Sequence, residues 1–305
     1  MDSAKSNTPI EPESEPAHKG ILRDETIILR WIFGYCHNAQ LIDGTSWPDI
    51  PQTSIRRGIN SNIKDLAFLS IDADHIRFEN DVVQRFHFGV SYLKAKALQQ
   101  LLLDGQSTQE GVDLASRLIT TRHFVFGYKN GFFEQRYYHF LFGKAMPLSK
   151  GFTLLEECLK KFTKEPYVLV YHGGRQELEL LPLLNIELKP VFTIDTCKAA
   201  QFPLQLWYRY SLKLLLKEFN IPYSNLHTAG NDAHFALRVL LMIAVRDAEI
   251  HLKGNNLPDW IPILKAVARS PLPPRRLTKR QLAAIAEAEA EAKDERHTTI
   301  EAEGG

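Results

Sequence analysis

The chain has 305 residues, of which 44% are hydrophobic and 24% charged, and its formal net charge is +1. These values are ordinary for a soluble globular protein, and near-neutrality does not exclude nucleic acid binding because a local basic groove can lie on a neutral protein. The three scattered cysteines, none in a CxxC pair, exclude a disulfide framework and a cysteine-rich zinc site.

Residues 1–24 are rich in Ser, Glu, Pro and Lys and are predicted to be a disordered tail. They lack the apolar stretch of a signal peptide, and no segment approaches the roughly 20 apolar residues needed to span a bilayer. We therefore expect an intracellular protein, cytoplasmic or nuclear, that does not enter membranes.

The next elements form an N-terminal unit and a central domain. A helix is expected over residues 25–39 and a loop or linker over 45–62. Residues 25–62 thus form an N-terminal helix and linker, and the main domain is predicted for residues 63–255. Alternating or continuous apolar runs predict strands over 66–73, 84–93, 122–128, 167–172 and 190–196. Helical patterns cover 151–162, 175–184 and 211–219. This order predicts an α/β domain with a mixed sheet and helices on both faces.

A long buried helix follows the stretch "LHTAGND" at residues 226–232. Its apolar residues cover more than one face, namely Ala236, Val239, Leu240, Ile243 and Ala244 together with Leu237, Leu241 and Met242. Asn231 or Asp232 is expected to cap this helix. Residues 256–305 are predicted to be a linker and a solvated Ala/Glu-rich tail.

Acidic residues lie at the ends of several of these elements. Asp72 and Asp74 are two residues apart on the first strand, so both point to the same side. Glu177 begins the helix after the fourth strand, and Asp232 begins the long helix, five residues after His227. Each feature alone has an ordinary structural explanation, but together they predict a metal site. Clustered carboxylates repel one another unless a cation neutralises them, and hard oxygen ligands select Mg²⁺ or Mn²⁺.

The spacing of the last two residues is typical of a known nuclease family. With His227 and Asp232 separated by four residues, the chain resembles DEDD-type 3′–5′ exonucleases of the ribonuclease-H-like superfamily, in the subtype with a catalytic histidine. Within that group it is most similar to fungal proteins related to the C-terminal domain of "good for full DEAD-box protein activity". The resemblance covers roughly residues 65–249.

The first two motifs of the family are matched with altered acids. In the first, Asp72 is followed by Asp74 where the family has Glu. In the second, His172 is followed by Gln176, and then Glu177 stands where the family has Asp. One carboxylate arm is therefore a methylene shorter and the other a methylene longer than the family pattern. The two changes either compensate each other or mark a site that no longer catalyses.

Three further segments resemble the family. The second strand carries Phe86 and His87 where the family usually has Thr and Glu, and residues 139–149 match a segment before a helix. The strand that ends at Asp195 and Thr196 also matches.

The resemblance implies a ribonuclease-H-like mixed five-stranded sheet and two-metal hydrolysis of a phosphodiester bond with two Mg²⁺ or Mn²⁺ ions. Asp72 would bridge the ions, Asp74 and Asp232 would hold one, and Glu177 would help to hold the other. His227 would be the general base, since imidazole exchanges protons near neutral pH. The substrate would be RNA or single-stranded DNA, released as nucleoside monophosphates, and protein partners in RNA processing or RNA export are implied.

Several other residues are candidates for binding the substrate. Arg122, Arg175 and Lys198 are candidate phosphate contacts, and the apolar residues after His75 are candidates to wedge the terminal base. A second interpretation is a ribonuclease-H-like adaptor with weak or no activity. A third, a nucleotide-binding module that uses residues 172–174, lacks any phosphate-loop motif, and the absence of G-x-S-x-G argues against an α/β-hydrolase.

Overall fold

The computed structural model describes residues 19–36, 40–52, 62–80, 82–103, 111–127, 139–148, 151–174, 176–253 and 256–274, together with positions 283 and 287. Residues 1–18 of the expected N-terminal tail, 53–61 of the expected linker, Arg175 and nearly all of the Ala/Glu-rich tail lie outside this part. Within the described residues, no helix has both the length and the apolar character needed to cross a membrane. All three cysteines are free.

The strands in the described residues form one mixed six-stranded sheet with the order β4-β3-β2-β1-β5-β6. Their bounds are β1 Ala67–Glu79, β2 Val82–Lys94, β3 Thr120–Phe126, β4 Met146–Pro147, β5 Tyr167–Tyr171 and β6 Phe192–Asp195. The first three strands are antiparallel, β4 is parallel to β3, and β5 and β6 are parallel to β1. This mixed sheet with helices confirms the predicted ribonuclease-H-like α/β class. The predicted count of five strands was wrong, because β4 is two residues long and leaves no alternating pattern.

Within the described residues, the helices include the five that the sequence predicted before residue 256. Their bounds are α1 Asp24–Ile32, α2 Ala95–Leu103, α3 Leu114–Leu118, α5 Thr153–Phe162, α6 Gln176–Leu183, α7 Thr196–Ala199, α8 Leu212–Glu218, α9 Ala229–His251 and α10 Trp260–Ala268. Four of them, α2, α3, α7 and α10, were not predicted. Their apolar residues gain partners only when the sheet brings distant segments together.

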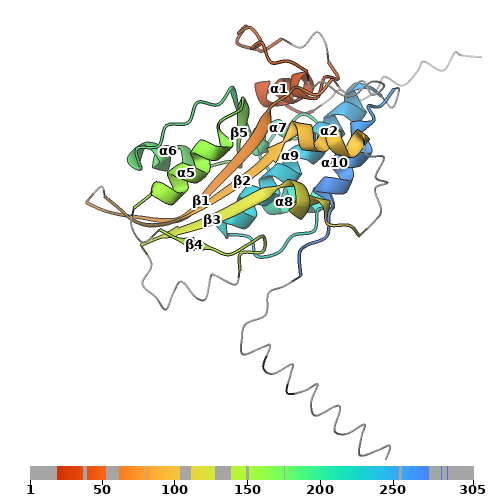
Figure 1. Cartoon of the computed structure of the whole chain (residues 1–305). Helices are drawn as coiled ribbons and strands as arrows, with labels where there is room; N and C mark the ends of the chain where they lie inside the picture. The colour runs from red at the N-terminus through yellow and green to blue at the C-terminus, as the bar shows by residue number, and fades with distance from the viewer. Residues whose placement is uncertain are drawn as a thin grey trace, which may run out of the picture.

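The two faces of the sheet are covered by different helices. Figure 1 shows α5 and α6 on one side of the strands and α9 with α10 on the other. Alternation along β1 sends Leu69 and Ile71 into the core under α5 and α6, whereas Phe68 packs into the core that contains α9. The residues on the α9 side of β1 therefore face the helix that His227 precedes.

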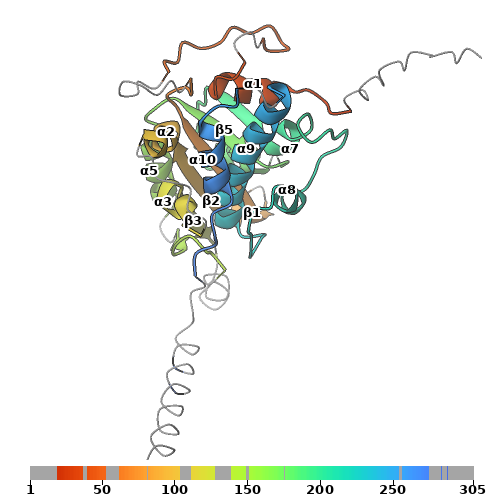
Figure 2. The same cartoon turned by 90° about the vertical axis from the view of Figure 1, so that its right-hand side faces the viewer.

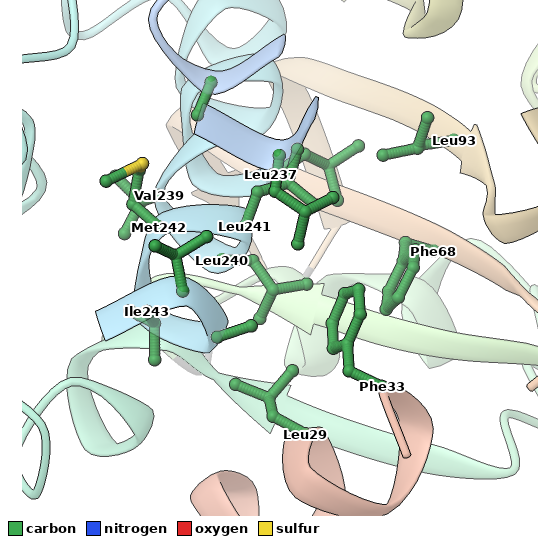
Figure 3. Packing of buried hydrophobic residues seen from close by; sticks show 14 of the residues in the cluster. Leu29, Phe33, Phe68, Leu93, Leu237, Val239, Leu240, Leu241, Met242 and Ile243 are labelled. Atoms are coloured by element: carbon green, nitrogen blue, oxygen red, sulfur yellow. The ribbon is translucent and has the colours of Figure 1, made fainter. Parts of the chain in front are cut away.

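The long helix α9 is the centre of the larger core. Its residues from Phe235 to Val245 are all buried, which confirms the prediction of a helix that is apolar on more than one side. Figure 3 shows Leu240 and neighbouring α9 residues packing against Phe68 of β1, Leu93 of β2, and Leu29 and Phe33 at α1. Figure 2 shows α10 alongside α9. Both α1 and α10 thus belong to the same core as the sheet, although the predicted central domain spanned only residues 63–255.

Candidate active site

Asp72 and Asp74 lie on the α9 side of β1. They alternate with Ile71 and Ala73, whose side chains enter the core on the other face. The parallel pairing of β1 with β5 ends at Ser70, so both aspartates lie beyond the last residue that β5 pairs with β1. The sequence predicted that this strand ends at residue 73. In the structure it continues to Glu79, because it forms a long hairpin with β2 that extends to the left in Figure 1.

Glu177 reaches the same stretch of β1 from α6. It lies in the first turn of that helix and is only 4% exposed. Its Oε1 lies 3.5 Å from the backbone nitrogen of Ala73, the residue between the two aspartates. The structure therefore brings Glu177 to Ala73, which lies 104 positions earlier, and close enough to Asp72 for its charge to raise the pKa of that residue.

Asp232 and His227 are joined at the start of α9. The carboxylate Oδ2 of Asp232 accepts a hydrogen bond of 2.9 Å from the backbone N–H of His227. His227 is exposed and adopts a left-handed backbone conformation with φ of 62°, which is uncommon for a residue other than glycine. The residue expected to supply the base is thus tied by its backbone to an expected metal ligand, while its imidazole faces solvent.

The expectation that Asn231 or Asp232 caps α9 was wrong. The cap residue is Thr228, whose carbonyl accepts hydrogen bonds from the backbone N–H groups of both residues, at 2.7 Å and 3.0 Å. The buried amide of Asn231 instead donates to the carbonyls of His139 and Asn225. Both polar side chains are therefore used to hold neighbouring segments against the helix.

Three of the four acids have a raised pKa in the folded protein. Burial raises the pKa of Asp72 well above its usual value, and the charges of Asp232, Glu177 and Asp74 raise it further. Burial also raises the pKa of Asp232 to about 7, with the backbone hydrogen bond from His227 opposing the shift and Asp74 adding to it. Burial likewise raises the pKa of Glu177. Because like charges that are held together in a buried place resist ionisation, these acids favour their protonated forms unless a cation binds among them.

Three carboxylate oxygens of this group are buried and accept no hydrogen bond from the described residues. They are Oδ2 of Asp74, Oε2 of Glu177 and Oδ1 of Asp232. Buried polar atoms are normally satisfied, so such oxygens suit a divalent cation, for which carboxylates are preferred ligands. As the side chains stand, no three His, Cys, Asp or Glu groups in the described residues already meet the geometry of a metal site. The donor set therefore fits a cation in its chemistry, and binding would require the carboxylates to move together.

His75 is a neighbour that the sequence analysis did not assign to the site. Its Nε2 lies 3.1 Å from Oδ2 of Asp74, and its backbone N–H donates to the other carboxylate oxygen at 2.7 Å. Its ring contacts the edge of His87, which pairs with Asp74 across the β1–β2 ladder. A cation that binds Asp74 must therefore compete with the imidazole of His75.

A tight contact between α9 and the sheet holds the start of that helix in position. Gly89 on β2 lies so close to α9 that a Cβ atom would come within 1.9 Å of the carbonyl oxygen of Ala229. His123 on β3 accepts a hydrogen bond of 3.0 Å at Nδ1 from the backbone N–H of Gly230. Burial lowers the pKa of His123 to about 4, with the charge of His75 a smaller cause, so the ring is neutral near pH 7 and can accept this bond.

The loop that carries the second motif, which begins at His172, contacts the end of β6 and the start of α7. His172 Nδ1 lies 2.8 Å from the hydroxyl of Thr196, and its Nε2 lies 3.4 Å from Sγ of Cys197. Asp195 accepts hydrogen bonds of 2.9 Å from the backbone N–H groups of Gly173 and Cys197. Burial lowers the pKa of His172 to about 4, and burial with the charge of Asp195 raises that of the Cys197 thiol to about 12, against a smaller effect of Arg209. The imidazole of His172 is therefore neutral and the thiol of Cys197 is protonated near pH 7, so Cys197 is not a thiolate nucleophile.

The candidate phosphate contacts have different surroundings. Lys198 forms an ion pair with Glu25 of α1 at 3.4 Å, so its charge is partly used within the protein. Arg122 is exposed on β3, and Arg175 lies outside the described residues. A pocket of about 560 Å³ is lined by residues of α6 and its surroundings, including Leu169, Leu181 and Ile186, and by none of the four acids.

The part of the chain that contains these acids matches a known protein family. A search of curated proteins finds no match to the chain. Residues 67–243, more than half of the chain, match the family described as DNA polymerase III subunit epsilon-like, C-terminal domain. This match spans β1, with Asp72 and Asp74, through Asp232 and most of α9. The chain therefore belongs to this DEDDh exonuclease-type family.

Proposed function

We propose that the protein is a metal-dependent 3′–5′ exonuclease that acts on RNA or single-stranded DNA. The observation that carries this proposal is that carboxylates from β1, α6 and α9 lie close together. Burial is the largest cause of the raised pKa of Asp72, and the charges of Asp232, Glu177 and Asp74 add to it. Carboxylates that are held this close together resist ionisation unless a bound cation compensates for their charge. Membership of an exonuclease-type family supports the same conclusion.

The acids would hold two Mg²⁺ or Mn²⁺ ions. Asp72 would contact both, Asp74 and Asp232 would hold one, and Glu177 would hold the other through the oxygen that lacks a partner. When bound, the ions supply an activated water and stabilise the leaving oxygen in an in-line displacement at phosphorus.

His227 would act as the general base and accept the proton of the attacking water on its imidazole. Its exposure lets it reach substrate, while the hydrogen bond from its backbone N–H to Asp232 keeps it beside the acids. The product would be a nucleoside monophosphate from the 3′ end. Phe78, which is 48% exposed on the hairpin that carries Asp72 and Asp74, is available to wedge the terminal base.

The position of Glu177 supports compensation between the two altered acids. Its longer arm reaches the backbone of Ala73, between Asp72 and Asp74, and does not point away from β1. In this proposal the added methylene on α6 would offset the methylene that Asp74 lacks. We extend the proposal to the closer kinship with the fungal proteins named above, which the match of residues 229–233 (AGNDA) supports. RNA-processing or RNA-export partners belong to the same proposal, because that kinship implies them.

A second candidate function is a nucleic-acid-binding or protein adaptor with little activity. The observation that favours it is the contact of 3.1 Å between His75 and Asp74, which occupies a carboxylate that catalysis would require. Replacement of His75 by Asn would distinguish the two functions, since it should strengthen metal binding and activity in an enzyme that His75 restrains.

The decisive experiment is a nuclease assay with Mn²⁺ or Mg²⁺ on single-stranded RNA and DNA labelled at the 5′ end. Stepwise shortening that is lost in Asp72→Asn and His227→Ala, but kept in the exposed control Asp259→Asn, is the expected result. A circular single-stranded DNA should remain uncut, because it has no 3′ end. Unchanged activity in both site variants would overturn the assignment, and no shortening with either metal would favour the adaptor.

A further inference from the structure

A group of aromatic side chains lies at the surface between α7 and α8. Trp207 is 74% exposed, the highest value among the large hydrophobic residues that the structure describes, and Tyr208 is 45% exposed. Their rings contact edge to face with centroids 5.1 Å apart, and Tyr208 lies 5.4 Å from the ring of Tyr210. The exposed guanidinium of Arg209 completes this group, which we call the WYRY surface, residues 207–210. Isolated exposed apolar residues are normal, but contiguous exposed aromatic rings usually mark a binding surface.

The WYRY surface is connected to the loop that carries Glu177. Sγ of Cys197 donates a hydrogen bond of 3.2 Å to the carbonyl of Tyr210. The same sulfur lies 3.4 Å from Nε2 of His172, which directly follows β5 and precedes Glu177 by five residues. Arg209 is close enough to lower the pKa of Cys197, although burial and Asp195 outweigh it. The WYRY surface therefore lies beside the second motif. Two contacts, between Tyr210 and Cys197 and between Cys197 and His172, connect it to the loop that precedes Glu177.

The chemistry of this surface complements that of the acids. Four carboxylates repel a phosphate backbone, so a polyanionic substrate must be held by groups outside them. Flat aromatic rings stack on the faces of unpaired bases, and an arginine among them can pair with phosphate or stack on a base itself. A duplex hides the faces of its bases within the helix, so exposed rings of this kind favour single strands.

We propose that Trp207 and Tyr208 form a stacking platform for unpaired bases of a single-stranded nucleic acid, with Arg209 contacting its backbone. The inference rests on the proposed function, since it assigns a binding subsite to that same active site. It also narrows the substrate to strands with a single-stranded segment long enough to contact both the acids and the platform.

Binding can be measured separately from hydrolysis by removing metal ions with EDTA. The probe is a single-stranded 12-nucleotide oligomer, compared with an abasic oligomer of the same length that keeps the phosphates. Stacking should quench the fluorescence of Trp207, because this residue is exposed whereas Trp260 is buried and Trp31 and Trp47 are partly covered. We expect quenching with the base-containing oligomer and much less with the abasic one.

The variants test whether the rings themselves provide the affinity. The double variant Trp207→Ala/Tyr208→Ala should weaken binding at least tenfold, since each stacked base contributes appreciably to affinity. Trp207→Phe should keep most of the affinity but lose the quenching. The control Leu154→Ala removes an apolar side chain of similar exposure on α5, across the sheet, and should leave binding unchanged.

The possible results of these experiments distinguish failure of the stacking platform from failure of the proposed exonuclease function. Quenching without any metal-dependent hydrolysis would support the platform while the exonuclease proposal fails. Hydrolysis with unchanged affinity in the double variant, or equal binding of the abasic oligomer, would overturn the platform alone. A double variant that keeps its affinity but changes from dimer to monomer would show that the surface joins two copies of the chain, which also overturns the platform.

Discussion

Replacement of Asp232 by Asn should stabilise the metal-free protein, and the gain should grow with pH. The pKa of Asp232 rises from its usual 3.8 to about 7 in the folded protein, and burial is the largest cause. Between these two values the folded protein keeps a proton that the unfolded chain has released. The free energy of unfolding therefore falls as the pH rises through this range, and the loss is complete above the folded pKa.

The size of the effect follows from the shift. A shift of about 3 pKa units corresponds to about 4 kcal/mol at pH 8, because each unit is worth about 1.4 kcal/mol. At pH 5 only about one unit separates the solution from the unfolded pKa, so about 1–2 kcal/mol is lost there. Asn keeps an oxygen that can accept the backbone hydrogen bond of His227, so the substitution removes the charge with little other change.

Urea unfolding in EDTA at pH 5 and pH 8 measures this difference directly. The Asn variant should exceed the natural protein in stability by about 1–2 kcal/mol at pH 5 and by up to about 4 kcal/mol at pH 8. Added Mn²⁺ should stabilise the natural protein at pH 8 more than the variant, since a ligand that binds only the folded state raises its stability. An equal effect at the two pH values, or a destabilised variant, would refute the electrostatic reasoning.

Three further substitutions test the framework around the site. Gly89→Ala should cost about 1–3 kcal/mol or more, because its Cβ would overlap the carbonyl of Ala229, and urea unfolding would measure the loss. Arg30→Met should cost about 3–5 kcal/mol, since it leaves the fully buried carboxylate of Asp247 without its cation, and thermal and urea unfolding would report it. Glu177→Asp should weaken Mn²⁺ binding in calorimetry by about tenfold or more, because the shortened arm withdraws from β1.

Each of these outcomes has its own control. Gly44→Ala, at a glycine with open space around it, reports the cost of its positive φ without a clash and should be milder than Gly89→Ala. Replacing Arg30 and Asp247 together by Met and Leu should recover much of the stability lost in the single variant. Tighter Mn²⁺ binding by Glu177→Asp would contradict the idea that its length compensates for Asp74.

Local features of the chain could be read directly from the sequence. His227 and Asp232 are five residues apart at the start of one helix, so their proximity needs only a correctly predicted helix start. The apolar positions of α9 predicted its burial because helical periodicity is a local property. The prediction of the cap residue was wrong, because the side chain of Asn231 is used instead to bind the carbonyls of residues 139 and 225, which only the folded chain brings near.

The meeting of the acids depended on the tertiary structure. Alternation predicted that Asp72 and Asp74 share a side of β1, but only the parallel pairing with β5 determines that Glu177 reaches Ala73. The contact of His75 with Asp74 had no signal in the sequence, since it depends on one left-handed residue within the hairpin. Secondary structure follows from neighbouring residues, whereas the electrostatics of a site follow from distances between residues far apart in the chain, which only the packed fold determines.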